Sequence, residues 1–147
     1  MNKNAECSTV TDIHHEIKVK ADPERVRTAL GSREALEAWH GGAVSDAGGG
    51  GWRFDFVNGP TFHWRIAPDT GENDVTWCCV DGPGDSAGTE AKFTFIPQPD
   101  GRTLVEFRHS GWPHAGGNFR KCNTHWAILL HQLRRYVETG AAAPVFN

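Results

Sequence analysis

The sequence has no long hydrophobic run and no cluster of basic residues. No stretch approaches the roughly 18 consecutive apolar residues that a membrane-spanning helix needs. The densest basic group is the pair Arg134 and Arg135, and the 15 basic residues are outnumbered by 18 acidic ones. Nucleic acids and anionic membranes bind to concentrated basic surfaces. We therefore expect no nucleic-acid partner and no membrane span.

The start of the chain also lacks the apolar run of a signal peptide, since Met1 to Thr11 is polar. We therefore expect a cytoplasmic protein, in which disulfides are rare. The four cysteines form no Cys-x-x-Cys motif, and we interpret Cys79 and Cys122 as small buried hydrophobic residues. His14 and His15 have no second pair of ligands nearby. The sequence therefore predicts no metal site and no other cofactor.

Catalytic motifs are missing as well. There is no Gly-x-Ser-x-Gly sequence, and neither paired inward-facing carboxylates nor a cysteine beside a histidine is evident. Residues 48–51 are all glycine, but they lack the spacing of a phosphate-binding loop and precede a strand pattern rather than a helix. The sequence assigns no catalytic residue, and it favours a binding protein over an enzyme.

Large aromatic side chains dominate what is present. The chain has six Trp and eight Phe but one Tyr and one Met, a composition that suits a thick core or the wall of an apolar cavity. Apolar and aromatic residues alternate with polar ones along short segments between residues 52 and 110. The inward-facing sets are Trp52, Phe54 and Phe56; Phe62, Trp64 and Ile66; Val75, Trp77 and Cys79; Ala91, Phe93 and Phe95; Val105, Phe107 and His109. This period of two predicts an antiparallel sheet with one buried face.

Two short helices and one further strand are expected before this sheet region. Residues 12–20 alternate as a half-buried strand does. Asp22 and Ser32 are typical N-caps for helices over residues 23–30 and 33–39. The segment 41–51 is rich in glycine and poor in apolar residues, so we expect the second strand to be short or mobile.

The last element is a helix of about 20 residues between Asn118 and Gly140. Its apolar residues fall within one arc of roughly 120°. They are Phe119, Cys122, Trp126, Leu129, Leu130, Leu133, Tyr136 and Val137. The aromatic face of the sheet is the available partner for this stripe. We therefore expect Trp126 and Leu133 to pack against the inward residues of the sheet, with Trp64, Trp77 and Phe107 in contact.

The order of elements resembles the helix-grip fold of the START/Bet v1-like superfamily (SRPBCC). Within it, the chain is similar to the bacterial branch grouped with homologues of the activator of the Hsp90 ATPase. The resemblance is carried by residues 17–26, 36–39, 88–93, 103–112 and 133–140, and it runs from about residue 12 to 144. It implies one α+β domain over residues 1–147, with a curved antiparallel sheet wrapped around the C-terminal helix. The superfamily carries lipids, steroids and polyketides and includes some cyclases.

We therefore expect binding or transport of a small hydrophobic molecule between the long helix and the sheet. The residues expected to contact it are Trp64, Trp77, Phe107, His109 and Trp126, with His15 as a second polar group and Trp39 and Trp112 near the mouth. Pockets of this kind are mostly apolar with a few placed polar groups. Each of these residues also has a plainer interpretation as part of the core or as a loop anchor.

Two other functions remain open at this point. A cyclase- or dehydratase-like enzyme would need His15 or His109 as a general acid or base within hydrogen-bond reach of the substrate. A co-chaperone-like protein-interaction module would need a contiguous exposed apolar or charged patch. A homodimer is a further candidate assembly.

Overall fold

A seven-stranded antiparallel sheet wraps around one long helix in the computed structural model, which describes residues 11–67, 71–141 and 144. The strand order is β1-β7-β6-β5-β4-β3-β2. The strands are β1 (Ile13–Val19), β2 (Ala43–Gly48), β3 (Gly51–Asp55), β4 (Thr61–Ile66), β5 (Asp74–Asp81), β6 (Glu90–Pro97) and β7 (Thr103–Ser110). The helices are α2 (Pro23–Ala29), α3 (Arg33–Trp39) and α4 (Asn118–Thr139), with a 3₁₀ turn η1 (Gly84–Ser86).

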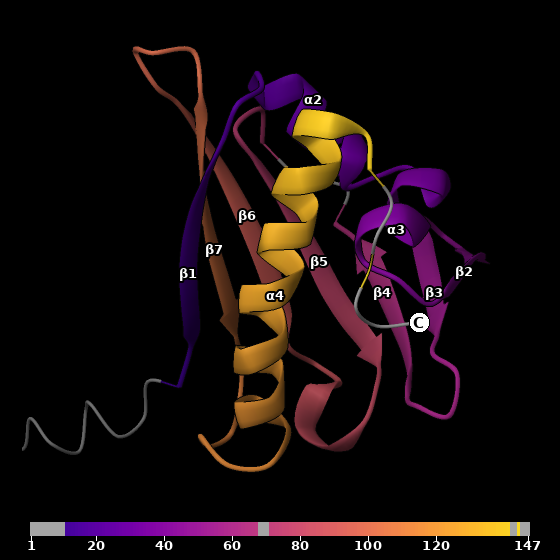
Figure 1. The fold of residues 1–147 in the computed structure, drawn as a ribbon. Helices are drawn as coiled ribbons and strands as arrows, with labels where there is room; N and C mark the ends of the chain where they lie inside the picture. The colour runs from indigo at the N-terminus through magenta and orange to yellow at the C-terminus, as the bar shows by residue number, and fades with distance from the viewer. Residues whose placement is uncertain (1–10, 68–70, 142–143, 145–147) are drawn as a thin grey trace, which may run out of the picture.

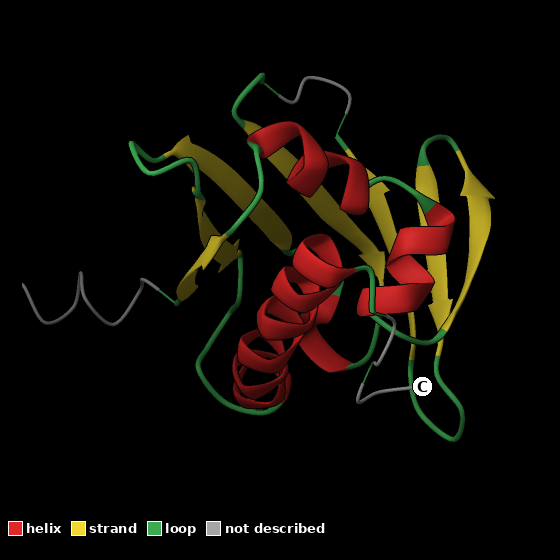
Figure 2. Cartoon of the chain, turned by 45° about the horizontal axis from the view of Figure 1, so that its top comes forward, coloured by secondary structure: helices red, strands yellow, loops and turns green. Residues whose placement is uncertain are grey.

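The three α-helices lie on the same side of the sheet (Figures 1 and 2). Helix α4 runs along the sheet, and α2 and α3 lie beside its C-terminal half. This arrangement is the α+β helix-grip architecture that the order of elements predicted. None of the described helices has both the length and the apolar character needed to cross a membrane. Cys7 and most of the polar start of the chain lie outside the described residues.

The sheet residues alternate between its two faces as the period of two predicted. On β7, Val105, Phe107 and His109 are buried, whereas Glu106 and Arg108 are exposed. The adjacent strands keep the same faces in register, because β7 pairs with β1 on one side and with β6 on the other. The inward face therefore forms one continuous aromatic surface.

The glycine-rich segment forms a longer strand than the sequence indicated. Strand β2 has six residues and pairs with β3, placing Val44 opposite Phe54. It is an edge strand, and Val44 is its one buried residue, so the apolar pattern is weak. The turn that follows places Gly48, Gly49 and Gly50 at φ values of 80°, 58° and 80°. Only glycine adopts this left-handed backbone at no steric cost, which explains the run of glycines.

Capping residues set the bounds of the helices. The Asp22 side chain accepts a hydrogen bond from Arg25 N at 2.9 Å, and the Ser32 hydroxyl accepts one from Ala35 N at 3.4 Å. Gly140 ends α4 with a left-handed φ of 76°, and its N–H donates to the Tyr136 carbonyl at 2.7 Å. The bounds of all three helices agree with the sequence-based prediction to within one residue.

Trp126 and Leu133 on α4 pack against the sheet as expected. The Trp126 ring lies 4.3 Å from Phe107, 6.3 Å from Trp77 and 6.4 Å from Trp64, measured between ring centroids. Leu133 is fully buried. These contacts bury the apolar stripe of α4, and apolar burial is the main source of stability in a domain of this size.

Leu133→Ala should therefore lower the free energy of unfolding by about 2–5 kcal/mol, because it removes a buried side chain and leaves a cavity. Arg135→Ala on the exposed face of the same helix is the control, with an expected change within about 0.5 kcal/mol. Urea unfolding followed by circular dichroism measures both. A similar loss in the two variants would show that α4 is not anchored through this stripe.

Candidate functional site

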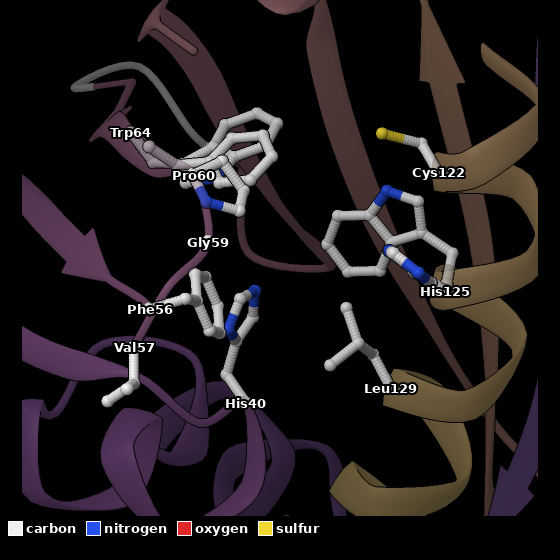
Figure 3. Close-up of a pocket in the computed structure, with 11 residues that line it drawn as sticks. His40, Phe56, Val57, Gly59, Pro60, Trp64, Cys122, His125 and Leu129 are labelled. Carbon is white, nitrogen blue, oxygen red and sulfur yellow. The ribbon is translucent and has the colours of Figure 1, made fainter. Parts of the chain in front are cut away.

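An apolar cavity of about 350 Å³ lies between α4, the end of α3 and the turn that joins β3 to β4 (Figure 3). It is lined by His40, Phe56, Val57, Gly59, Pro60, Phe62, Trp64, Cys122, His125, Trp126 and Leu129. Cavities that bind small molecules have a similar character, mostly apolar with a few polar groups. This cavity is the candidate functional site.

The β3–β4 hairpin forms the aromatic wall of the cavity. Phe62 stacks on Trp64 at 6.2 Å with an interplanar angle of 9°, and Phe56 meets Phe62 edge-on at 6.4 Å. The turn between the strands contains Asn58, which has a φ of 53°, a conformation that asparagine tolerates better than most residues. Val57 beside it is 74% exposed. The hairpin thus places flat rings on the inside and an apolar side chain at the mouth.

Helix α4 forms the opposite wall. Four of its residues line the cavity and share one face of the helix, namely Cys122, His125, Trp126 and Leu129. Burial raises the pKa of the Cys122 thiol to about 11, and burial also raises that of Cys79 to about 12. Both thiols stay protonated near neutral pH, so they are unreactive and behave as small hydrophobic groups.

His40 is the buried polar residue of the cavity. It is the C-cap of α3, is 5% exposed, and contacts the rings of Trp39, Phe54, Phe56, Trp77 and Trp126. Desolvation lowers its pKa to about 4, and a contact with the Gly41 carbonyl opposes this only in part. His40 is therefore neutral at pH 7. His125 lies at the exposed rim, and its pKa is lowered by partial burial and by the charge of Lys121.

His109 lies behind the cavity wall, in a chain of three hydrogen bonds. Trp126 Nε1 donates to His109 Nδ1 at 3.0 Å. His109 Nε2 therefore carries the ring proton and donates to Thr89 Oγ1 at 2.7 Å, and the Thr89 hydroxyl donates to the Ser86 carbonyl at 2.6 Å. Burial lowers the pKa of His109 to about 3. His109 is thus a fixed, neutral residue that orients Trp126.

Of the residues expected to contact a ligand, the structure brings only Trp64 and Trp126 to this cavity. Trp77 and Phe107 are buried in the core beneath it. His109 contacts Trp126 from behind, and neither ring nitrogen of His109 is left to face the cavity. An inward-facing position on a strand shows that a side chain points to the core, but not whether open space lies in front of it.

The other expected contacts also lie elsewhere. Trp39, expected near the mouth, is fully buried and donates its indole N–H to the Ala29 carbonyl at 2.8 Å. Trp112 is buried beside His109, with ring centroids 4.7 Å apart. His15 is half-buried on β1, where its Nε2 lies 3.2 Å from the Asn123 carbonyl oxygen. The cavity opens instead beside the β3–β4 turn, where Val57 lies.

The sequence did not reveal most of the residues that line the cavity, although it carries signals for several of them. Cys122, His125 and Leu129 follow a helical spacing of three and four residues, which places His125 next to the apolar stripe. His40 follows Leu36 by four residues and so shares its buried face. Turn residues such as Gly59 carried no signal, because their role depends on how the hairpin curves toward α4.

Comparison with known proteins agrees with the fold and identifies the family. Residues 20–138 match the family described as Activator of Hsp90 ATPase homolog 1-like protein. The chain belongs to this family. The resemblance drawn from the sequence is thereby confirmed. The sequence matches no protein of curated function at a significant level.

Solved structures show how far the likeness extends. The Aha1 dimer from Colwellia psychrerythraea is 30% identical, with a TM-score of 0.75 over 88% of this chain and 97% of that one. DynU16, described as a protein in the dynemicin biosynthetic locus, is 19% identical with a TM-score of 0.73, over 90% of this chain and 49% of that one. Protein CV1439 from Chromobacterium violaceum is 21% identical with a TM-score of 0.69, over 87% and 98%. The last two share the fold alone.

The hydrogen bond between Trp126 and His109 can be tested with a matched pair of substitutions. Trp126→Phe leaves His109 Nδ1 buried without a donor, which costs about 1–3 kcal/mol beyond the loss of ring volume. Trp77→Phe removes similar volume, but the Trp77 indole N–H has no hydrogen-bond partner among the described residues. Urea unfolding should therefore show the larger loss for Trp126→Phe. Equal losses would mean that this hydrogen bond does not stabilise the fold.

The two buried histidines predict a stability loss in mild acid. Burial lowers the pKa of His40 to about 4 and that of His109 to about 3, whereas a histidine in the unfolded chain has a pKa of about 6.5. At a pH between the folded and unfolded pKa values, the unfolded chain therefore binds more protons than the folded protein. Stability is therefore complete above pH 6.5 and falls as the pH drops, by up to about 1.4 kcal/mol per pH unit for each histidine. His40→Phe should reduce the slope measured by urea unfolding from pH 5 to 7. An unchanged slope would contradict the neutral state of His40.

Proposed function

We propose that this protein binds a small hydrophobic molecule in the cavity between the β3–β4 hairpin and α4, and so stores or carries it. The observation that supports the proposal is the cavity itself. It opens to solvent, and several aromatic side chains line it, whereas the other hollows of the described surface have few. A concave space of about 350 Å³ walled by Phe56, Phe62, Trp64, Trp126 and Leu129 suits an apolar occupant.

The size and chemistry of the cavity suggest the class of ligand. Its volume of about 350 Å³ is near the lower end of the roughly 300–1,000 Å³ typical of small-molecule sites. A compact ring compound suits it better than a long-chain lipid. A ligand that buries ~300 Å² of apolar surface gains roughly 7 kcal/mol before the costs of ordering are subtracted. That gain is enough for useful affinity without any charged contact.

The two alternative functions have weaker support. An enzyme of the cyclase or dehydratase type would need His15 or His109 to reach the substrate, but neither lines the cavity. A protein-interaction module would need a contiguous apolar surface, yet Val57 and Val80 are the two large hydrophobic residues exposed in the described part of the chain.

The likeness to the dimeric Aha1 of Colwellia psychrerythraea supports a homodimer, which light scattering on the purified protein would test.

Ligand binding can be tested by filling the cavity. We expect a neutral, environment-sensitive dye such as N-phenyl-1-naphthylamine to bind to the wild type with increased emission. Leu129→Phe, which adds volume inside the cavity, should weaken binding at least tenfold because an apolar ligand loses the space it occupied. Calorimetry and dye fluorescence measure the same affinity independently.

Leu104→Phe is the matched control. Leu104 alternates with the buried residues of β7 and so lies on the other face of the sheet, where the same substitution should leave dye binding unchanged. Native mass spectrometry of the protein as purified would reveal a co-purifying ligand. Absence of dye binding to the wild type, or equal binding by Leu129→Phe and the wild type, would refute binding in this cavity.

A further inference from the structure

The polar side of the cavity is formed by two histidines that differ in how deeply they are buried. Figure 3 shows His40 projecting between the hairpin and α4, while His125 projects from α4 on the opposite side. His40 is buried, whereas His125 is exposed at the rim. A polar atom that is buried and fixed discriminates between ligands, because a ligand that fails to pair with it leaves it unsatisfied.

Aromatic packing fixes the orientation of the His40 ring. Phe54 lies 4.5 Å from it on one side, and Trp39, Phe56 and Trp77 lie between 5.4 and 6.2 Å away, measured between ring centroids. A ring enclosed in this way cannot turn over without displacing its neighbours. The tip of the ring, which carries Nε2, is directed away from its own backbone and toward the cavity (Figure 3).

The hydrogen-bond role of each ring nitrogen follows from the surroundings. His40 Nδ1 lies 3.5 Å from the Gly41 carbonyl oxygen, an acceptor, so the ring proton of the neutral form belongs on Nδ1. Nε2 then carries a lone pair, and no hydrogen bond to it is found among the described residues. Because the ring stays neutral when buried, this lone pair accepts a hydrogen bond and cannot donate one.

We propose that His40 Nε2 is the recognition atom of the cavity and selects a flat, neutral ligand with a hydroxyl or N–H donor, such as a phenol or an enol. This inference rests on the proposed function. A flat ring suits the stacked and edge-on aromatic rings of the hairpin wall. A carboxylate is disfavoured, since its oxygens only accept hydrogen bonds and its charge would be desolvated among apolar side chains.

Three probes that share the naphthalene ring and are similar in size separate these possibilities by calorimetry at pH 7. They are 1-naphthol, which donates a hydrogen bond, 1-methoxynaphthalene, which does not, and 1-naphthoate, which is charged. The wild type should bind 1-naphthol about three- to tenfold more tightly than 1-methoxynaphthalene, and 1-naphthoate most weakly. His40→Phe should bind the first two probes equally. His125→Phe, the same change at the rim of the same cavity, should keep the preference for 1-naphthol.

A second readout does not depend on a variant. In the wild type with ¹⁵N-labelled histidine, the unprotonated His40 Nε2 should shift on addition of 1-naphthol but not of 1-methoxynaphthalene. Equal affinity for 1-naphthol and 1-methoxynaphthalene, tightest binding of 1-naphthoate, or loss of the preference in His125→Phe rather than His40→Phe would each overturn the role of His40 and leave ligand binding intact. If none of the probes binds, the proposed function itself fails.

Discussion

The contact between α4 and the sheet through Trp126 determines how the rest of the structure is arranged. Trp126 packs against Phe107 at a tilt of 39°, with ring centroids 4.3 Å apart, and its indole N–H donates to His109 Nδ1. The apolar contact supplies the energy, and the hydrogen bond sets the rotation of the indole ring about its axis. One side of the ring therefore closes the core, and the other side is presented to the cavity. A single residue thus contributes both to stability and to the site.

The cavity exists because the sheet curves while α4 is straight (Figures 1 and 2). Near β7 and β1 the sheet lies against the helix, and core side chains fill the space. Toward β3 and β4 the sheet has moved away, and the rings of Phe56 and Phe62 cover only part of the gap. A strand pair at the far side of a twisted sheet cannot follow a straight helix over its full length. The position of the site is thus a consequence of the topology.

This geometry also explains what the sequence could and could not predict. Periodicity of two and of 3.6 residues identified the strands, the helices and the packing of Leu133 and Trp126 on the sheet, because burial repeats with the period of each element. The site was harder to predict. Trp39, Trp77 and Phe107 have the same inward pattern as Trp64, and only the local separation of helix and sheet decides which of them faces open space. His40 was missed although it follows Leu36 by four residues, because it lies one residue beyond the end of α3.

His40 and His109 show how burial alone leaves the role of a histidine undecided. Both are desolvated and neutral, with pKa values lowered to about 4 and about 3. They differ in the number of ring nitrogens that already have partners. In His109 both nitrogens are engaged, one by Trp126 and one by Thr89, so the ring has nothing left to offer a ligand. In His40 only Nδ1 has a neighbouring acceptor, and Nε2 points into an apolar space. A ligand that covers this atom without donating a hydrogen bond to it leaves the acceptor unpaired, which costs free energy. That cost gives the cavity a reason to prefer one class of occupant over another.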